Sequence, residues 1–415
     1  MLLLPILILL LVLIFISIRT TFKRKIDIWK IMFLGALIVI LTGQISLYNA
    51  YLSIQFNVII FLFSMFVVGL ALEKSNYLLN TSHLFLRYFK SKNTLLFGLI
   101  FITGFLSFFI VNDTLAVVTV SLAAYISSKH GIKLKPLLLV MAFSITLGSV
   151  MSPIGNPQNL LIASSGLSSP FLIFFRYLFI PTMLNLFIVY FIIKIFYGKS
   201  FKTKKILVHT REPILDNNLA KIVKISIAIL FLTILFNVIS SIINLGYQIG
   251  LVYIGIFSAL PILLLSNRRV EIFKEVNWSI LIFFVSMFIL IQSVWLSGVI
   301  QPLLGQVYNN LASIPFIFGV SIILSQFISN LPLVALYIPI LKNIGVSIIG
   351  FMALAAGSTI AGNVSILGAA SNIIIINQAE KKYNETISMW EFVKIGIPLT
   401  IINALVYFLF LYIGL

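Results

Sequence analysis

The 415-residue chain is too apolar for a water-soluble protein. Apolar side chains make up 61% of it and charged ones only 9%, whereas a soluble domain carries about 25% charged residues. The net charge of +18 would suggest nucleic acid or an acidic partner in a soluble protein. Here the basic residues separate the apolar runs, so we attribute the charge to membrane orientation and predict no nucleic-acid binding.

The polar residues offer little for catalysis. The chain has no cysteine, which excludes disulfides, thiolate metal sites and cysteine nucleophiles. Its three histidines, His83, His130 and His209, lie in connecting segments, without the His/Glu spacing of a zinc or nuclease site. We therefore predict no metal, no cofactor other than a coupling Na⁺ or H⁺, and no enzymatic activity.

The apolar runs predict membrane-spanning helices, because each is close to the ~20 residues that cross a bilayer core ~30 Å thick. In the first run a basic cluster follows the apolar residues instead of preceding them, which favours a retained helix over a signal peptide. The expected spans are 2–18, 31–48, 53–72, 136–165, 171–197, 225–243, 250–266, 277–297, 345–379 and 395–413.

Two further apolar stretches, 93–128 and 312–341, do not fit single spans. The first has 36 residues with one charge, Asp113, and as one helix it would be ~54 Å long. It must therefore turn back on itself. We predict that both stretches are re-entrant hairpins, the first from the cytoplasmic face and the second from the outer face.

The distribution of Lys and Arg gives the orientation, since these residues accumulate in short cytoplasmic loops. With both termini outside the plasma membrane, 26 of the 28 Lys and Arg residues fall inside. Only Arg176 and Lys342 do not. Apart from Lys194 at a helix end, the inside residues lie in loops 19–30, 73–92, 129–135, 199–224, 267–275 and 380–394.

The two halves of the chain share sequence patterns in the same order. Segment 109–112 matches 327–330, and 155–162 matches 368–375 in a Gly-x-x-x-Asn frame followed by aliphatic residues. We predict an all-α polytopic fold of two inverted five-helix repeats, 1–198 and 225–415. Each contains a re-entrant hairpin and a broken helix, and a basic cytoplasmic linker, 199–224, joins them.

The hairpin tips and broken helices are the candidate substrate site, because non-helical backbone in a bilayer is tolerated only where protein buries it or water fills a cavity. Close helix packing with interhelical hydrogen bonds would explain any one of these residues alone. The symmetry-related clustering favours a site at mid-membrane. The candidate ligands are Asn112, Thr114, Ser152, Gly155, Asn156, Asn159, Ser329, Asn330, Gly362, Asn363, Ser365, Gly368 and Asn372.

Asp113 is the only acid in either hairpin or broken helix. An ionised carboxylate at a helix centre costs roughly 2.5–3.5 kcal/mol on insertion scales, so it needs a partner or a proton. A structural ion pair or hydrogen bond would satisfy this need. We favour the alternative that Asp113 binds the coupling ion.

These four clusters resemble the ion transporter superfamily, which includes arsenite permeases, citrate-type permeases and divalent-anion:sodium symporters. The motifs are Phe-Ile-Val-Asn-Asp-Thr at 109–114, Ser-Pro-Ile-Gly-Asn-Pro-Gln-Asn at 152–159, Ser-Gln-Phe-Ile-Ser-Asn-Leu-Pro at 325–332, and Ala-Gly-Asn at 361–363 with Ser-Asn at 371–372.

The resemblance implies inverted repeats, a homodimer, and a transport domain that moves against a scaffold. It also implies a division of the ligands: hairpin-tip residues Asn112, Thr114, Ser329 and Asn330, and helix-break residues Asn156 and Asn363. The first tip differs from the Ser-Asn-Thr of the dicarboxylate branch, and its Asn-Asp pair is more similar to the arsenite-permease branch.

The sequence thus predicts a secondary active transporter that works by alternating access. The expected substrate is a small inorganic oxyanion or its neutral hydroxide, such as arsenite or antimonite, coupled to a proton or cation. A sodium-coupled di- or tricarboxylate carrier of the citrate type is the alternative. A passive channel would not need two closed hairpins, and a membrane-embedded enzyme lacks a catalytic constellation.

Overall fold

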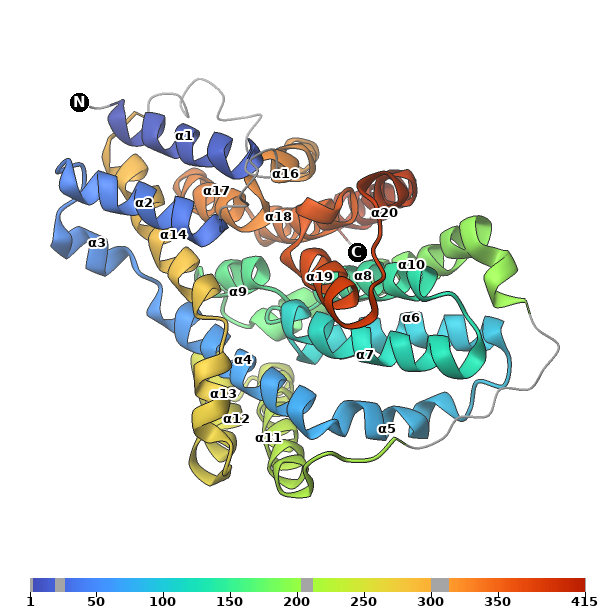
Figure 1. The fold of residues 1–415 in the computed structure, drawn as a ribbon. Helices are drawn as coiled ribbons and strands as arrows, with labels where there is room; N and C mark the ends of the chain where they lie inside the picture. The colour runs from blue at the N-terminus through green and yellow to red at the C-terminus, as the bar shows by residue number, and fades with distance from the viewer. Residues whose placement is uncertain (1–2, 19–26, 203–211, 300–312, 415) are drawn as a thin grey trace.

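The computed structural model describes residues 3–18, 27–202, 212–299 and 313–414, and no strand occurs in these ranges (Figure 1). The helices are α1 Leu4–Ile18, α2 Ile28–Leu41, α3 Leu47–Ser53, α4 Phe56–Ser75, α5 Tyr77–Leu86, α6 Lys92–Phe109, α7 Asn112–His130, α8 Leu134–Val150, α9 Pro157–Ala163, α10 Pro170–Tyr197, η2 Gly198–Phe201, α11 Asn217–Ile242, α12 Leu251–Leu265, α13 Arg269–Glu275, α14 Trp278–Leu296, α16 Ile314–Ile328, α17 Asn330–Ile344, α18 Ile348–Ile360, η3 Ala361–Asn363, η4 Ile366–Gly368, α19 Ala370–Tyr383 and α20 Met389–Ile413.

The helical fold suits a bilayer. Six helices of the described residues are long and apolar enough to span it: α4, α6, α10 extended by η2, α11, α14 and α20. Large apolar side chains such as Leu232, Leu235 and Ile239 of α11 are exposed on the outside of the molecule, where lipid would cover them. The expected all-α membrane fold is therefore confirmed.

The apolar stretch at 93–128 turns back on itself, as predicted. Helix α6 ends at Phe109 and α7 begins at Asn112, with two non-helical residues, Ile110 and Val111, between them. The Lys92 ammonium donates to the carbonyl of Gly131 at 3.2 Å. The start of α6 and the end of α7, the two helix ends farthest from the turn, therefore meet. The stretch at 312–341 likewise forms α16 and α17, which meet at Ser329; residue 312 lies outside the described residues.

The helices predicted at 136–165 and 345–379 are both interrupted. Helix α8 stops at Val150, and α9 starts only at Pro157. Helix α18 stops at Ile360 and is followed by the short helices η3 and η4 before α19. The interruptions fall on the Pro- and Gly-containing segments. The inverted repeat that would relate the two halves stays a prediction.

Other predicted elements were wrong in detail. The single helix expected at 31–48 is divided, because Gly43 has a left-handed φ of 70° after α2 and Ser46 caps the start of α3. That pair is a typical helix stop followed by a helix start. The loops expected at 73–92 and 267–275 contain helices α5 and α13, which are too short to span a bilayer.

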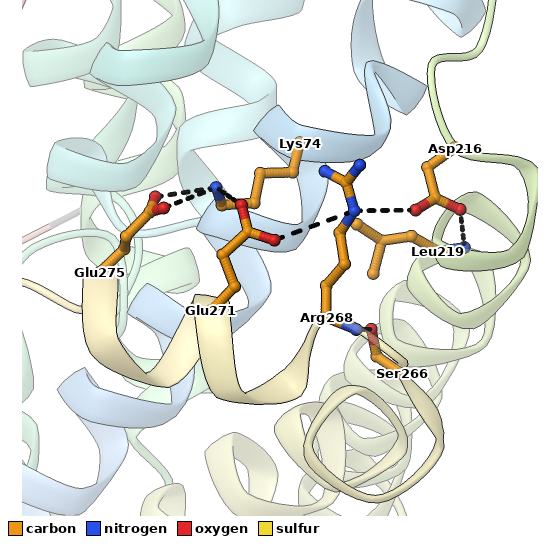
Figure 2. Close-up of polar contacts among 7 residues, drawn as sticks. All are labelled: Lys74, Asp216, Leu219, Ser266, Arg268, Glu271 and Glu275. Carbon is orange, nitrogen blue, oxygen red and sulfur yellow. Dashed lines mark hydrogen bonds and ion pairs between the residues drawn. The ribbon is translucent and has the colours of Figure 1, made fainter.

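The basic segments lie on one face of the molecule, which we call the basic face. Segments 73–92, 129–135, 212–224, 267–275 and 380–394 are joined to one another by direct contacts, part of which Figure 2 shows. The contacts are Lys74–Glu271 at 2.6 Å, Lys382–Glu73 at 2.9 Å, Lys135–Glu391 at 3.3 Å, Arg268–Asp216 at 3.2 Å, Asn76–Pro213 at 2.8 Å and Lys92–Gly131 at 3.2 Å.

These contacts agree with the grouping of loops that the positive-inside rule gave, although the compartment that the face occupies stays a prediction. Linker residues 203–211 and most of the loop at 19–30 lie outside the described residues.

Candidate substrate site

A cavity of about 310 Å³ lies at the tips of both hairpins, and we call it the tip cavity. The starts of four helices, α7, α9, α17 and α19, form one side, and side chains of α2 and α14 line another. The lining residues used below are Trp29, Asn112, Asp113, Pro157, Gln158, Ser279, Ile280, Phe283, Gln326, Ser329, Asn330, Gly368 and Ala370.

Hydrogen bonds attach the first hairpin to the first helix break. The backbone N–H of Asn112 donates to the carbonyl of Gly155 at 2.7 Å, and the Ser152 hydroxyl donates to the carbonyl of Phe108 at 2.5 Å. A Cβ on Gly155 would lie 2.7 Å from the Ser149 carbonyl oxygen. Gly155 therefore permits the close approach of backbone that closes this junction.

The second hairpin is attached to the second break through side-chain amides. Gln326 donates to the carbonyl of Ala361 at 2.8 Å and accepts from the Ser365 hydroxyl at 3.3 Å. Asn372 donates to the carbonyl of Gly362 at 2.7 Å. The Asn372 bond satisfies the Gly362 carbonyl, which the interrupted helix leaves without an intrahelical partner, whereas the Ala361 carbonyl also accepts from the N–H of Val364 at 3.2 Å.

The two asparagines of the first break are fully buried and hold it in shape. Asn159 donates to the carbonyls of Ser149 at 2.9 Å and Ser152 at 3.0 Å, while the Asn156 side chain caps α9 by accepting from the N–H of Asn159 at 2.8 Å. Thr359 of α18 accepts from Asn156 at 3.2 Å and donates to the Asn159 oxygen at 3.3 Å. The two breaks are thus bonded to each other.

Three of the helix starts at the tip cavity have no side-chain cap. The residues before α7, α17 and α19 are Val111, Ser329 and Ala369, and none of them caps its helix with a side-chain hydrogen bond. Uncapped N–H groups and the helix dipole favour ligand oxygens. Ser329 also has a φ of 67°, which non-glycine residues rarely adopt. Such strain is characteristic of binding sites.

Unpaired acceptor oxygens occur at both tips. The Oδ1 atoms of Asn112 and Asn330 are buried without a hydrogen-bond partner in the described structure. Asp113 is 5% exposed and forms neither an ion pair nor a hydrogen bond with any described residue. Buried polar groups are normally paired, so these oxygens are available to a ligand that donates hydrogen bonds or carries positive charge. Buried amides that line neither cavity, such as those of Asn363 and Asn403, also lack partners in the described structure, so it is the position at the cavity wall that distinguishes the tip oxygens.

The sequence matches the family described as citrate transporter over residues 9–350, which is most of the chain. The protein belongs to this family. An uncharacterized transporter of Synechocystis sp. is 26% identical, covering 94% of this chain and 93% of its own. A silicon efflux transporter of rice, Oryza sativa subsp. japonica, is also 26% identical, covering 89% of each chain.

The fold of this citrate transporter family member is similar to that of the YdaH transporter of Alcanivorax borkumensis. The crystal structure aligns with a TM-score of 0.55 at 14% identity, over 86% of this chain and 84% of that one. The resemblance to the ion transporter superfamily is confirmed, and the protein is a membrane transporter with a multi-pass helical fold.

The structure distributes the candidate residues of this transporter among three places. Those that line the tip cavity are Asn112, Asp113, Ser329, Asn330 and Gly368. Thr114 lines a neighbouring cavity. The residues that line neither cavity, and that belong to the helix breaks, are Ser152, Gly155, Asn156, Asn159, Gly362, Asn363, Ser365 and Asn372.

Sequence reasoning missed part of the cavity wall. Gln158 and Gln326 line the cavity although they were not candidates, and Trp29, Ser279 and Phe283 contribute from α2 and α14. The two glutamines lie within the motifs at 152–159 and 325–332. Their place in these motifs could have identified them as candidate ligands. The residues of α2 and α14 lie in ordinary apolar spans and carry no such signal.

Proposed function

We propose that the tip cavity binds a small inorganic hydroxide in its neutral or weakly acidic form, such as arsenous, antimonous or silicic acid. The observation that carries this proposal is the pair of unpaired acceptors Asn112 Oδ1 and Asn330 Oδ1, which line the same cavity as the Asp113 carboxylate. A polyhydroxide brings several O–H donors for these acceptors. Its own oxygens can accept from the uncapped starts of α7, α17 and α19.

The charge of the described cavity wall supports the same substrate class. Among the described residues that line the tip cavity there is no Lys, Arg or His, whereas Asp113 contributes a carboxylate. A di- or tricarboxylate would have to desolvate several negative charges beside that carboxylate, which is costly without a paired cation.

Citrate-type transport remains the second candidate. The family description favours it, and so do the three uncapped helix starts, whose dipoles stabilise anions. These dipoles contribute roughly 0.3–1 kcal/mol each at exposed sites, less than a paired Arg or Lys would supply. A bound metal ion or Na⁺ at Asp113 would have to balance the charge of such a substrate.

We further propose that Asp113 couples transport to H⁺ or Na⁺, because it is an unpaired carboxylate at the cavity wall. The basic face is assigned to the cytoplasm on the positive-inside rule, which leaves both termini outside the plasma membrane. The resemblance supports a homodimer of chains with inverted repeats 1–198 and 225–415.

Uptake into proteoliposomes tests the substrate class. We expect accumulation of arsenite, antimonite or silicic acid under an imposed pH or Na⁺ gradient, and no accumulation of citrate. Citrate accumulation without accumulation of any hydroxide would replace this proposal with the second candidate.

Single variants test the site itself. Asn112→Ala and Asn330→Ala should each weaken substrate affinity between about twofold and 150-fold, the range for losing a hydrogen bond to a buried polar group. Asn237→Ala is the matched control, because this buried asparagine of α11 bonds to the backbone of Ile249, beyond the end of α11, and lines neither cavity. It should lower stability and leave affinity unchanged. Unchanged affinity in both tip variants would remove the hairpin tips from the site.

A further inference from the structure

A second cavity, of about 450 Å³, adjoins the tip cavity. Asp113, Ser279 and Ile280 line both cavities, so the two meet at the carboxylate. The other walls of the second cavity come from α4, α7, α19 and the junction between α13 and α14. It extends to Glu73 and Glu275, which belong to segments of the basic face.

One face of α19 runs along this whole path. Ala370 lines the tip cavity, whereas Ile374 and Gln378 line the second cavity. Residues four apart lie on the same face of a helix, and Lys382 is the next residue in this series. The face of α19 that borders both cavities therefore ends at Lys382.

An ion pair joins that end of α19 to α4. The Lys382 ammonium lies 2.9 Å from a carboxylate oxygen of Glu73, and Glu73 itself lines the second cavity. The contact is therefore at the border of the cavity on the basic face. The ion pair connects α19, which starts at the tip cavity, with α4, which lines only the second cavity.

The strength of the pair suits repeated opening. The side chains of Lys382 and Glu73 are 40% and 27% exposed, and pairs with this much solvent contribute little to stability. A pair of this kind biases a conformation without locking it, which a contact that opens in every transport cycle requires.

We propose that the second cavity is the vestibule between the tip cavity and the basic face, and that the Glu73–Lys382 pair is the gate at its mouth. The proposal rests on the transport function proposed above, because it assigns a path to the substrate of that site. With the pair formed, the ends of α4 and α19 are held together. With the pair broken, they separate and the vestibule opens.

Thiol labelling in this cysteine-free chain tests the gate. Val117 of α7 is partly exposed and lines the second cavity, so Val117→Cys places one thiol in the vestibule. In membranes with the basic face accessible, Glu73→Gln and Lys382→Gln should each raise the rate of modification by a charged thiol reagent, by about 1.5-fold to fivefold for a partly exposed pair. Combining Glu73→Lys with Lys382→Glu should restore the parent rate.

Lys135→Gln provides the matched control. It breaks the Lys135–Glu391 pair, at 3.3 Å, on the same basic face, but neither residue lines the tip cavity or the second cavity. It should leave the labelling rate unchanged, and Lys382→Arg, which keeps the charge, should do the same. Unchanged rates in both single glutamine variants would overturn the gate, as would a charge-swapped protein that labels as fast as they do.

The labelling result does not depend on the identity of the substrate. If no hydroxide is transported but labelling responds as expected, the substrate class fails and the gate stands. If hydroxides are transported and labelling does not respond, the gate fails alone. Thermal melting of each variant shows whether a changed rate reflects the gate or a loss of fold.

Discussion

Asp113 shows how the surroundings of one residue decide between a structural and a functional role. Membrane-buried acids are commonly paired within the bundle. Asp113 is 5% exposed, has no partner among the described residues and borders two cavities. A carboxylate held in this way contributes no ion pair among the described residues, so its role is better explained by what enters the cavities.

We therefore expect Asp113→Asn to abolish gradient-driven accumulation while leaving substrate binding measurable. The substitution keeps the shape and removes the charge that would bind H⁺ or Na⁺. Accumulation is measured in proteoliposomes under separate pH and Na⁺ gradients, with thermal melting of the purified variant beside it. Accumulation equal to the parent in a stable variant would exclude Asp113 from coupling, and a loss of stability without selective loss of coupling would indicate a structural role.

The sequence predicted which hairpin-tip residues lie at the cavity, whereas their role as substrate ligands stays a prediction. Asn112 and Asn330 stand at the first residue after each hairpin turn, and both line the cavity. Asn156 and Asn159 were predicted as ligands too, but their amides bind backbone carbonyls, a helix start and Thr359. An amide serves equally well for a ligand or for unpaired backbone, so the sequence does not distinguish the two uses.

At the scale of the helices, close contact between α6 and α8 supports the first hairpin. Both Gly104 and Gly148 are buried at this crossing. A Cβ on Gly148 would lie 2.0 Å from the carbonyl oxygen of Gly104, which is backbone and cannot rotate away. The two helices are therefore closer than any side chain at position 148 would permit.

Gly148→Ala should lower the thermal stability of the purified protein, because overpacking of this kind typically costs about 1–3 kcal/mol. Gly319→Ala is the control, since Gly319 of α16 has no atom within 4 Å of a built Cβ. Alanine there should be neutral or stabilising by up to roughly 1 kcal/mol. Equal melting temperatures for Gly148→Ala and the parent would mean that the crossing is looser than the structure shows.

The sequence predicted a helix correctly where the length of an apolar run and its flanking charges left few alternatives. A largely apolar stretch of 36 residues, with a lysine next to each end, had to turn back, and the contact of Lys92 with Gly131 shows that it does. The division between α2 and α3 was missed, because Gly43 and Ser46 sit in a run that is apolar enough to span. Between α2 and α3, the left-handed Gly43 ends one helix and the Ser46 cap starts the next, although the hydropathy of the run alone predicts a single helix.

At the scale of the whole molecule, an ion-pair network fastens separate segments of the basic face (Figure 2). Lys74 of α4 bonds to Glu271 and Glu275 of α13 at 2.6 and 2.9 Å, and Arg268 connects Glu271 with Asp216. Mainly because Lys74 donates a hydrogen bond to it, Glu271 has a pKa below its usual 4.5.

A lowered pKa in the folded state means that ionised Glu271 favours folding. The contribution is fully present above pH 4.5, the usual value, and is lost as the pH falls through the lower value of the folded protein. We expect Glu271→Gln to reduce this part of the acid sensitivity of thermal unfolding, and to lower stability at neutral pH. Glu380→Gln, at a carboxylate without an ion pair in the described structure, should keep the parent pH profile. Identical profiles for Glu271→Gln and the parent would contradict the assignment.

The grouping of the described basic segments agrees with the contacts between them, and it was predictable because it used only the distribution of charge; the side of the membrane stays a prediction. The relation between the two halves was harder. Short matches such as 109–112 with 327–330 indicate related hairpins, but a similar motif does not determine how two halves are oriented. Packing against α2 and α14, which completes the tip cavity, depends on tertiary contacts that short motifs do not encode.

The bonds between the two helix breaks restrict how the molecule can move. Asn156 and Asn159 of the first break hold Thr359 beside the second one, with all three side chains fully buried. A hinge that opened between the halves at this point would leave buried polar groups without partners. The hairpin tips and breaks should instead move as one rigid body. If transport follows the alternating access proposed above, access would change by displacement of that body against α2, α4 and α14, and the substrate would be carried with its binding groups rather than released between them.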